Sequence, residues 1–196
     1  MIRSLTLPVT LATHVGDVVL RRATPADLDP LMALLADDSV SRSRGDRASA
    51  DDRDRSEAVL AELLADATND VLVVADGDGE VIGTMQVTRM PSLSRQAATR
   101  LQVETVRVSS RCRSGGVGSA MMRWVVTDAA GAMGATLVQL TSDAVREDAH
   151  RFYVRLGFTP SHVGFKLDLT SAVEPVQRSW VSRSKEAEAQ PWRRAN

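Results

Sequence analysis

A glycine-rich stretch in front of a helix-like run is the first feature of this sequence that could do chemistry. Residues 111–118 are RCRSGGVG, and the apolar run SAMMRWVV follows at once. Glycines let a backbone approach a ligand closely, and the first N–H groups of a helix attract an anion. Arg113 adds a cation whose planar guanidinium suits phosphate. The stretch therefore predicts either a phosphate or pyrophosphate site or a tight strand-to-helix turn that binds nothing.

Two common phosphate-binding motifs do not fit this stretch. A P-loop ends in Gly-Lys-Ser/Thr, and GVGSA at residues 116–120 lacks the lysine. A dinucleotide motif reads G-x-G-x-x-G, and Met121 stands where its third glycine belongs. The stretch also follows a hairpin instead of opening a first βαβ unit. These two motifs therefore do not identify the ligand of a phosphate site in this stretch.

Hydrophobic periodicity and turn residues predict the elements that must position the stretch. Helices are expected over 24–38, 57–67, 117–130 and 146–157. Strands are expected over 18–23, 101–109, 135–142 and 162–169, together with a hairpin over 70–90. The order is that of a mixed α/β domain. The polar segment 39–56 is expected to be either a solvated connection or a mobile, substrate-facing segment.

The strand over 101–109 leads directly into the glycine-rich stretch. Side chains alternate between the two faces of a regular strand. Leu101, Val103 and Thr105 are therefore expected on one face. The opposite face is expected to carry Gln102, Glu104, Val106 and Val108.

A second motif narrows the interpretation. Residues 151–158 are RFYVRLGF, and residues 106–122 are VRVSSRCRSGGVGSAMM. The distance between these two motifs suits one strand and two helices. The two motifs, in this order, resemble those of the GCN5-related N-acetyltransferases (GNAT), whose acetyl-CoA signature is Gln/Arg-x-x-Gly-x-Gly/Ala. The signature falls on Arg113 to Gly118, and the resemblance covers residues 18–169. It implies an α/β fold with a mixed, mostly antiparallel central sheet that is flanked by helices and splayed between the strands around 101–109 and 135–142.

The resemblance implies acetyl-CoA as co-substrate and no metal. The pyrophosphate would lie on the N–H groups of residues 114–119, and the pantetheine arm would run along residues 106–108 like an added strand. The residues implied to bind it are Val106, Arg107, Val108, Arg113, Ser114, Gly115, Gly116, Val117, Gly118 and Ser119. The family usually has glycine directly after the arginine of the signature, where Ser114 stands here.

The resemblance also implies two catalytic residues. An alkylammonium has a pKa near that of lysine, about 10, so the amine acceptor must lose a proton before it attacks. Glu104 occupies a position where family members commonly carry a glutamate, and it is the implied base, acting directly or through water. Tyr153 is the chain's only tyrosine and stands at the family's usual general-acid position. Without those roles, Glu104 would be an exposed strand carboxylate and Tyr153 a packing residue beside Phe152.

Composition limits the other expectations. The net charge of −1 at pH 7 suggests neither a nucleic-acid nor a membrane partner, and the single cysteine excludes an intrachain disulfide. Without a membrane span or a signal segment, a cytoplasmic location is expected. The expected organisation is an N-terminal extension (1–17), a GNAT domain (18–170) and a polar tail (171–196).

Two functions follow from this sequence. The first is an N-acetyltransferase that passes the acetyl group of acetyl-CoA directly to a primary amine in a ternary complex, with a small-molecule or peptide acceptor and a homodimer as a family-level expectation. The alternative is a GNAT-like module that binds acyl-CoA or a protein partner without catalysis. The mixed charge of segment 39–56 selects neither acidic nor basic acceptors.

Overall fold

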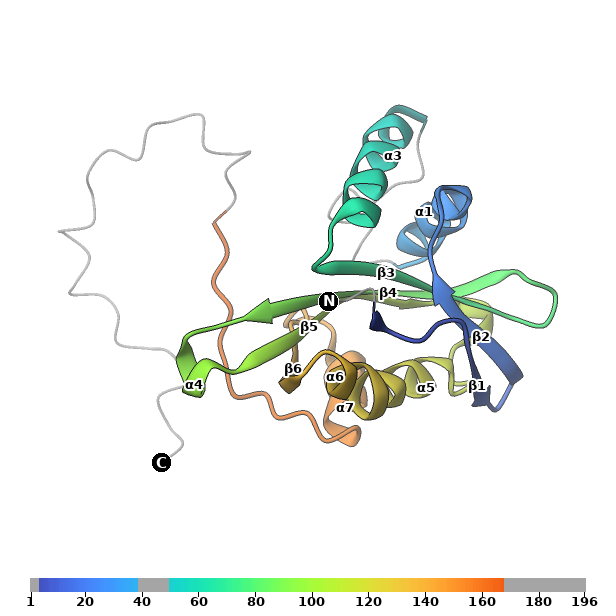
Figure 1. The fold of residues 1–196 in the computed structure, drawn as a ribbon. Helices are drawn as coiled ribbons and strands as arrows, with labels where there is room; N and C mark the ends of the chain where they lie inside the picture. The colour runs from blue at the N-terminus through green and yellow to red at the C-terminus, as the bar shows by residue number, and fades with distance from the viewer. Residues whose placement is uncertain (1–3, 39–49, 168–196) are drawn as a thin grey trace, which may run out of the picture. The chain divides into compact units, whose positions relative to one another are not determined.

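Six strands form one mostly antiparallel sheet (Figure 1). The computed structural model describes residues 4–38 and 50–167. Within them the strand order is β1-β2-β3-β4-β5-β6, and only the β5–β6 pair is parallel. The strands are β1 (Val9–Thr13), β2 (Gly16–Arg22), β3 (Asn69–Ala75), β4 (Val81–Pro91), β5 (Thr99–Val108) and β6 (Ala135–Leu140). The predicted mixed, mostly antiparallel sheet is confirmed.

The first strand is one that sequence patterning did not predict. β1 pairs with β2 from Val9↔Leu20 to Thr13↔Gly16, so it joins the sheet although it lies within residues 1–17. Val9 and Leu11 pack against the main core, and Leu5 is buried in it. The strand is only five residues long and follows Pro8, which left little periodicity to detect.

Helices α1 (Leu28–Ala36) and α3 (Ala50–Ala65) lie over one side of the sheet, here called the α1/α3 face (Figure 1). Their apolar residues cover β3: the cluster contains Leu28, Leu31, Met32, Leu60, Val71 and Val73. α3 begins seven residues earlier than the predicted helix over 57–67. The prediction missed residues 50–56 because this stretch of the sequence is mostly polar and lacks apolar periodicity. Residues 39–49 of the predicted polar segment lie outside the described residues.

The opposite side of the sheet, the α5/α7 face, carries the larger core. The predicted helix over 117–130 is present as α5 (Val117–Trp124), a π-helical stretch (Val125–Ala129) and α6 (Ala130–Ala132). α7 (Glu147–Arg155) is the predicted helix that carries the second motif. A short left-handed turn, α4 (Ser94–Ala97), links β4 to β5. The core beneath α5 includes Leu20, Leu72, Met85, Leu101, Met121 and Val125.

Residues 1–160 and residues 161–196 form two separate units. Residues 161–167 are the described part of the second unit, and they contain no strand. The predicted strand over 162–169 is therefore wrong for 162–167, while 168–169 and the tail over 171–196 lie outside the described residues. Val163, Phe165 and Leu167 do alternate as in a strand, but their side chains are exposed. Alternation alone supplies no hydrogen-bonding partner for a backbone.

A buried carboxylate ties β2 to the start of α1. Asp27 accepts two hydrogen bonds of 2.8 Å from the Arg21 guanidinium. The backbone N–H and the hydroxyl of Thr24 donate to the same carboxylate at 2.8 and 2.9 Å. The hydrogen bonds from Arg21, helped by those from Thr24 and opposed by burial, hold the pKa of Asp27 at about 2. The charged form of Asp27 is thus the form that stabilises the fold.

We expect Asp27→Asn to lower the free energy of unfolding by about 2 kcal/mol at pH 7. An unfolded aspartate has a pKa near 3.9, so the stabilisation is fully present above about pH 4 and is lost as the pH falls towards 2. Urea unfolding at several pH values measures this: the difference between wild type and variant should shrink below pH 4. Asp29→Asn, at an exposed pair with Arg53, is the control and should change stability little. Equal losses in the two variants would contradict the assignment.

Candidate active site

The glycine-rich stretch folds into a turn that opens helix α5. Ser114 and Gly116 both have left-handed backbones, with φ of 64° and 84°. The Gly115 N–H donates to the Cys112 carbonyl at 3.1 Å, and Gly116 is the N-cap of the helix. The Ala120 N–H donates to the Gly116 carbonyl at 2.9 Å, which is the first hydrogen bond of the helix. The N–H groups of residues 117–119 therefore have no acceptor within the helix. This helix end can therefore receive an anion.

The hairpin between β1 and β2 supports this turn from one side. The His14 N–H donates to the Gly115 carbonyl at 2.9 Å. A Cβ on Gly115 would lie 2.5 Å from Cγ1 of Val15 and 3.0 Å from the Cys112 carbonyl oxygen. A Cβ on Gly116 would lie 3.4 Å from the His14 nitrogen. The undetected first strand thus sets the shape of the turn that sequence analysis singled out.

Arg113, expected beside the phosphate, is tied to the end of α1. Its Nη2 donates to the Asp37 carbonyl at 3.1 Å, and the Asp37 carboxylate accepts a 2.6 Å hydrogen bond from the Ser110 N–H. The next residue, Asp38, forms an ion pair with Arg146 at the N-cap of α7. The side chains of this pair are only 15 and 18% exposed. Two consecutive aspartates therefore connect α1 to the loops on either side of α5 and β6.

An extra residue in β5 changes which side chains share a face. Gln86 of β4 pairs with Glu104, and Thr84 pairs with Arg107. Between these two pairs β5 has one residue more than β4. Thr105, which lies in this interval, has a left-handed backbone with a φ of 54°. This is a β-bulge, and it shifts the alternation by one residue.

Because of this bulge, the expected alternation along β5 is wrong beyond Glu104. Val106 and Val108 pack against the same core as Leu101 and Val103, on the α5/α7 face, instead of sharing a face with Glu104. The predicted alternation is wrong here because it holds only for a regular strand. The local sequence contains no glycine that would have signalled a bulge.

β5 also extends beyond its other neighbour. The β5–β6 pairing runs from Thr99↔Ala135 to Val103↔Leu140 and ends there. Over residues 104–108, β5 is paired to β4 on one side, and no β6 partner is present among the described residues. The sheet therefore parts between β5 and β6, where the splay was expected. The backbone edge of residues 106–108 is available to an extended ligand.

Glu104 is exposed and lies next to a row of polar side chains on the α1/α3 face. The row crosses four strands through the pairs Asn69↔Thr88, Thr88↔Gln102 and Gln102↔Gln139. Thr88 and Gln86 donate to the Asn69 side-chain carbonyl at 2.5 and 3.0 Å. The side-chain amide of Gln139 donates to the side-chain carbonyl of Gln102 at 2.7 Å. Gln102 was expected on the face of Glu104, but the other amides of the row were not predicted, because their grouping depends on strand register.

Tyr153 lies on α7, half-buried against the core of the α5/α7 face. Its ring meets Phe152 and Phe158 edge-on, with centroids 5.1 and 5.8 Å away. Burial raises the pKa of the Tyr153 phenol above its usual value, and the positive charges of Arg107 and Arg146 partly oppose that rise. The phenol is therefore a protonated group near the free end of β5.

The structure thus brings several predicted residues together. Gly118 of the turn lies close to Val108 of β5 and to Phe152, and Tyr153 packs against the same core of the α5/α7 face. Glu104 lies beyond the bulge, on the opposite face. Within the described residues, no group of three His, Cys, Asp or Glu side chains is arranged to hold a metal. Nor do those residues contain a helix with the length and apolar character of a membrane span.

Comparison with known proteins adds a family and several relatives. A family model described as "Acetyltransferase (GNAT) family" matches residues 32–158. The aminoalkylphosphonate N-acetyltransferase of Salmonella typhimurium is 33% identical over 88 residues, which are 45% of this chain and 56% of that protein. The chain thus matches little more than half the length of this curated relative.

Two solved structures resemble the chain over most of its length. A transcriptional regulator from Bacillus halodurans C-125 is 37% identical with a TM-score of 0.72, covering 77% of this chain and 99% of that one. A candidate acetyltransferase from Agrobacterium tumefaciens str. C58 is 27% identical with a TM-score of 0.64, covering 76% and 98%.

The turn gives a test with a matched control. We expect Gly115→Ala to lower the free energy of unfolding by about 1–2 kcal/mol, since its Cβ would overlap Val15 and the Cys112 carbonyl. Gly118→Ala should be neutral or stabilising, because its Cβ would meet Phe152 and Val108 only at 3.5 and 3.6 Å. Urea denaturation of both variants measures the difference. The same loss in both would show that the hairpin does not shape the turn.

Proposed function

The chain belongs to the GNAT family of acetyltransferases, and we propose that it is an acetyl-CoA-dependent N-acetyltransferase that acts on a primary amine in a ternary complex. The observation that carries this proposal is the parting of β5 from β6 directly before the glycine-rich turn. The edge of β5 would pair with the extended thioester arm. The N-terminus of α5, which follows directly, would bind the pyrophosphate. The measurement that tests it is acetyl-CoA turnover with a panel of amines.

Donor binding uses backbone groups for the most part. The N–H groups around residues 114–119 hold the pyrophosphate, and the edge of Val106 to Val108 pairs with the pantetheine amides. Arg107 points away from the core that Val106 and Val108 contact, since neighbouring side chains on a strand lie on opposite faces. Arg113 contributes its charge while one nitrogen stays bonded to Asp37. The bonded arginine keeps the loop closed against α1.

The acceptor approaches from the α1/α3 face, where Glu104 is exposed beside the amide row. Glu104 takes a proton from the ammonium form of the acceptor, directly or through one water molecule, and leaves a neutral amine. The side chains of Gln86, Gln102 and Gln139 offer hydrogen-bond donors and acceptors to the rest of the acceptor. A polar amine fits this floor better than an aliphatic one.

The amine nitrogen then attacks the thioester carbonyl carbon. The carbonyl oxygen gains negative charge, which backbone N–H groups at residues 106–108 stabilise. The carbon–sulfur bond breaks, and the thiolate takes the phenolic proton of Tyr153. A thiol has a pKa near 8.5, well below that of the Tyr153 phenol, so the phenol acts by protonating sulfur as the bond breaks. After attack the nitrogen still carries one proton too many; it releases this proton to solvent as the amide forms, and solvent returns a proton to the Tyr153 phenolate.

The acceptor panel has a rational first member. The Salmonella relative is described as acting on aminoalkylphosphonates, which join a primary amine to an anion. Arg107 points to the face of β5 on which Glu104 lies, so its positive charge would stabilise the anion of such an acceptor. Amino acids, polyamines, aminoglycosides and peptide amines complete the panel.

One observation favours the alternative of a non-catalytic module. The Bacillus halodurans structure, 37% identical over nearly its whole length, is described as a transcriptional regulator. A chain of that kind would bind acyl-CoA and report its presence to a partner. Acetyl-CoA binding without turnover on any amine of the panel would favour this alternative, and the absence of coenzyme A binding would exclude both functions.

We expect Glu104→Gln to lower kcat/KM for the best amine by about 10²–10⁴-fold at pH 7. The loss should diminish as the pH approaches 10, because the free amine then forms without a base. A pH–rate profile of both enzymes measures this. Glu80→Gln, an exposed glutamate in the β3–β4 turn, is the control and should match wild type. A loss that does not change with pH would remove Glu104 from the role of base.

Tyr153→Phe should keep the ring contacts with Phe152 and Phe158 but lose the proton donor. We expect kcat to fall by about 100-fold, with little change in the Kd of acetyl-CoA. Because the pKa of Tyr153 is raised, the wild-type rate should show no falling limb from this group up to about pH 10. Steady-state kinetics and calorimetry measure the two effects. A wild-type value of kcat in the variant would leave Tyr153 with a packing role alone.

A further inference from the structure

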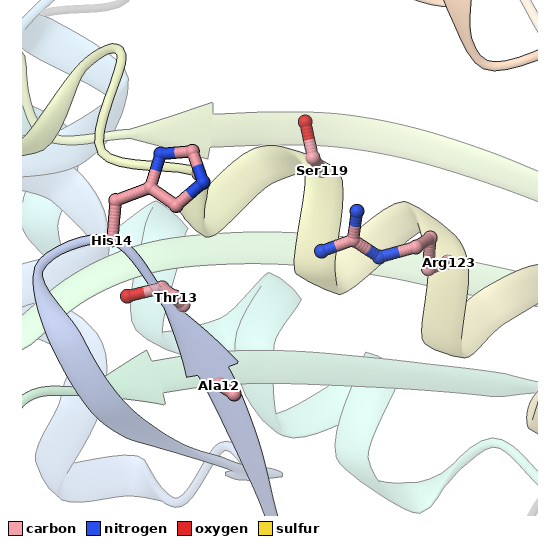
Figure 2. A pocket seen from close by; sticks show the side chains of 6 residues that line it. Ala12, Thr13, His14, Ser119 and Arg123 are labelled. Atoms are coloured by element: carbon pink, nitrogen blue, oxygen red, sulfur yellow. The ribbon is translucent and has the colours of Figure 1, made fainter.

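A pocket of about 290 Å³ lies beside the glycine-rich turn, between the end of β1 and helix α5 (Figure 2). Its lining consists of Ala12, Thr13, His14, Gly116, Ser119 and Arg123. Phe152 lies next to Gly118, so the α7 side of α5 is occupied by that ring. The pocket opens instead towards β1, away from the phenol and the parted strands.

Four polar side chains border this pocket, and one of them, the Thr13 hydroxyl, donates to the Gly16 carbonyl at 2.6 Å. Ser119 and Arg123 are four residues apart on α5 and therefore lie on one face of the helix. Figure 2 shows the Arg123 guanidinium turned back along the helix towards Ser119, with the His14 imidazole across the pocket. Together they offer an arginine fork, a hydroxyl and a ring nitrogen to one small volume.

No acidic group of the described chain neutralises this pocket. Within residues 4–38 and 52–167, neither the Arg123 guanidinium nor the His14 imidazole has a hydrogen-bond or ion-pair partner. His14 uses its backbone N–H to hold Gly115, which fixes its position without engaging its ring. Most other arginines near the site are engaged, as Arg113 is with Asp37 and Arg146 with Asp38.

We propose that His14, Ser119 and Arg123 form a binding site for a phosphate monoester. Arginine binds phosphate through two parallel hydrogen bonds, and a hydroxyl and an imidazole can donate to the remaining oxygens. The pocket is too small for a whole nucleotide but accommodates one phosphate and part of the group that it esterifies. Its wall at Gly116 is shared with the turn to which the donor pyrophosphate is assigned.

Two sources can supply such a phosphate. One is the 3′-phosphate of coenzyme A, and this source depends on the proposed function. The other is a free phosphate monoester that binds beside the turn without the cofactor, and this source does not. The two differ in whether removal of the 3′-phosphate from coenzyme A changes its affinity.

The test is isothermal titration calorimetry of the full chain with coenzyme A, 3′-dephospho-coenzyme A and inorganic phosphate, for wild type, Arg123→Gln and Arg123→Lys. With the 3′-phosphate as ligand, Arg123→Gln should weaken coenzyme A binding about ten-fold or more and leave the dephospho form within two-fold. Arg123→Lys should retain part of the affinity, since it keeps the charge but loses the fork. Arg55→Gln on the exposed face of α3 is the matched control and should equal wild type.

The other outcomes are equally decisive. Equal wild-type affinity for both coenzyme A forms, together with inorganic phosphate binding that Arg123→Gln abolishes, would support the site with a free monoester as ligand. Equal weakening of both coenzyme A forms, or no effect of Arg123→Gln on any of the three ligands, would overturn the proposal. If wild type binds neither coenzyme A form, the proposed function fails, and the inorganic phosphate titration still decides the pocket. Thermal unfolding of each variant verifies that the helix is intact.

Discussion

The arrangement of this domain depends on the backbone edge that β5 exposes where it leaves β6. Pairing with β6 ends at Val103, while pairing with β4 continues to Val108. Backbone N–H and C=O groups require partners, so such an edge is stable only against water or an extended ligand. The bulge at Thr105 lies at this point and turns Val106 and Val108 into the core. One side of the edge is thereby held rigidly while the other stays open to a donor.

The end of α1 connects the two sides of the sheet. Asp37 holds Ser110 and Arg113, on the loop before α5, and Asp38 holds Arg146 at the start of α7. A charge pair as little exposed as Asp38 and Arg146 is strongly destabilising when one partner is lost, because the other is left without compensation. The same pair places a positive charge near Tyr153. The helix that covers the acceptor face therefore also positions the loops that face the donor.

Sequence patterning found the elements with strong local signals and missed what depends on contacts between distant segments. The start of α5 at Val117 was evident from the glycine stretch and the apolar run behind it. β1 was missed because five residues give little periodicity, and the bulge because alternation was assumed to be regular. The contacts between Asp38 and Arg146 span 108 positions, which no local pattern reports. The amide row around Gln102 likewise exists only through strand register.

The departure from the family signature at Ser114 bears on how the turn works. A left-handed conformation costs a residue with a side chain about 1–2 kcal/mol, and Ser114 adopts it where glycine is usual. The bonds from Gly115 to Cys112 and from His14 to Gly115 hold the turn in that conformation without a ligand. Because the turn is ordered before an anion arrives, binding does not have to supply its conformational entropy. The hairpin of β1 and β2 is therefore part of the binding site, and it contacts the turn through the hydrogen bond from the His14 backbone N–H to the Gly115 carbonyl.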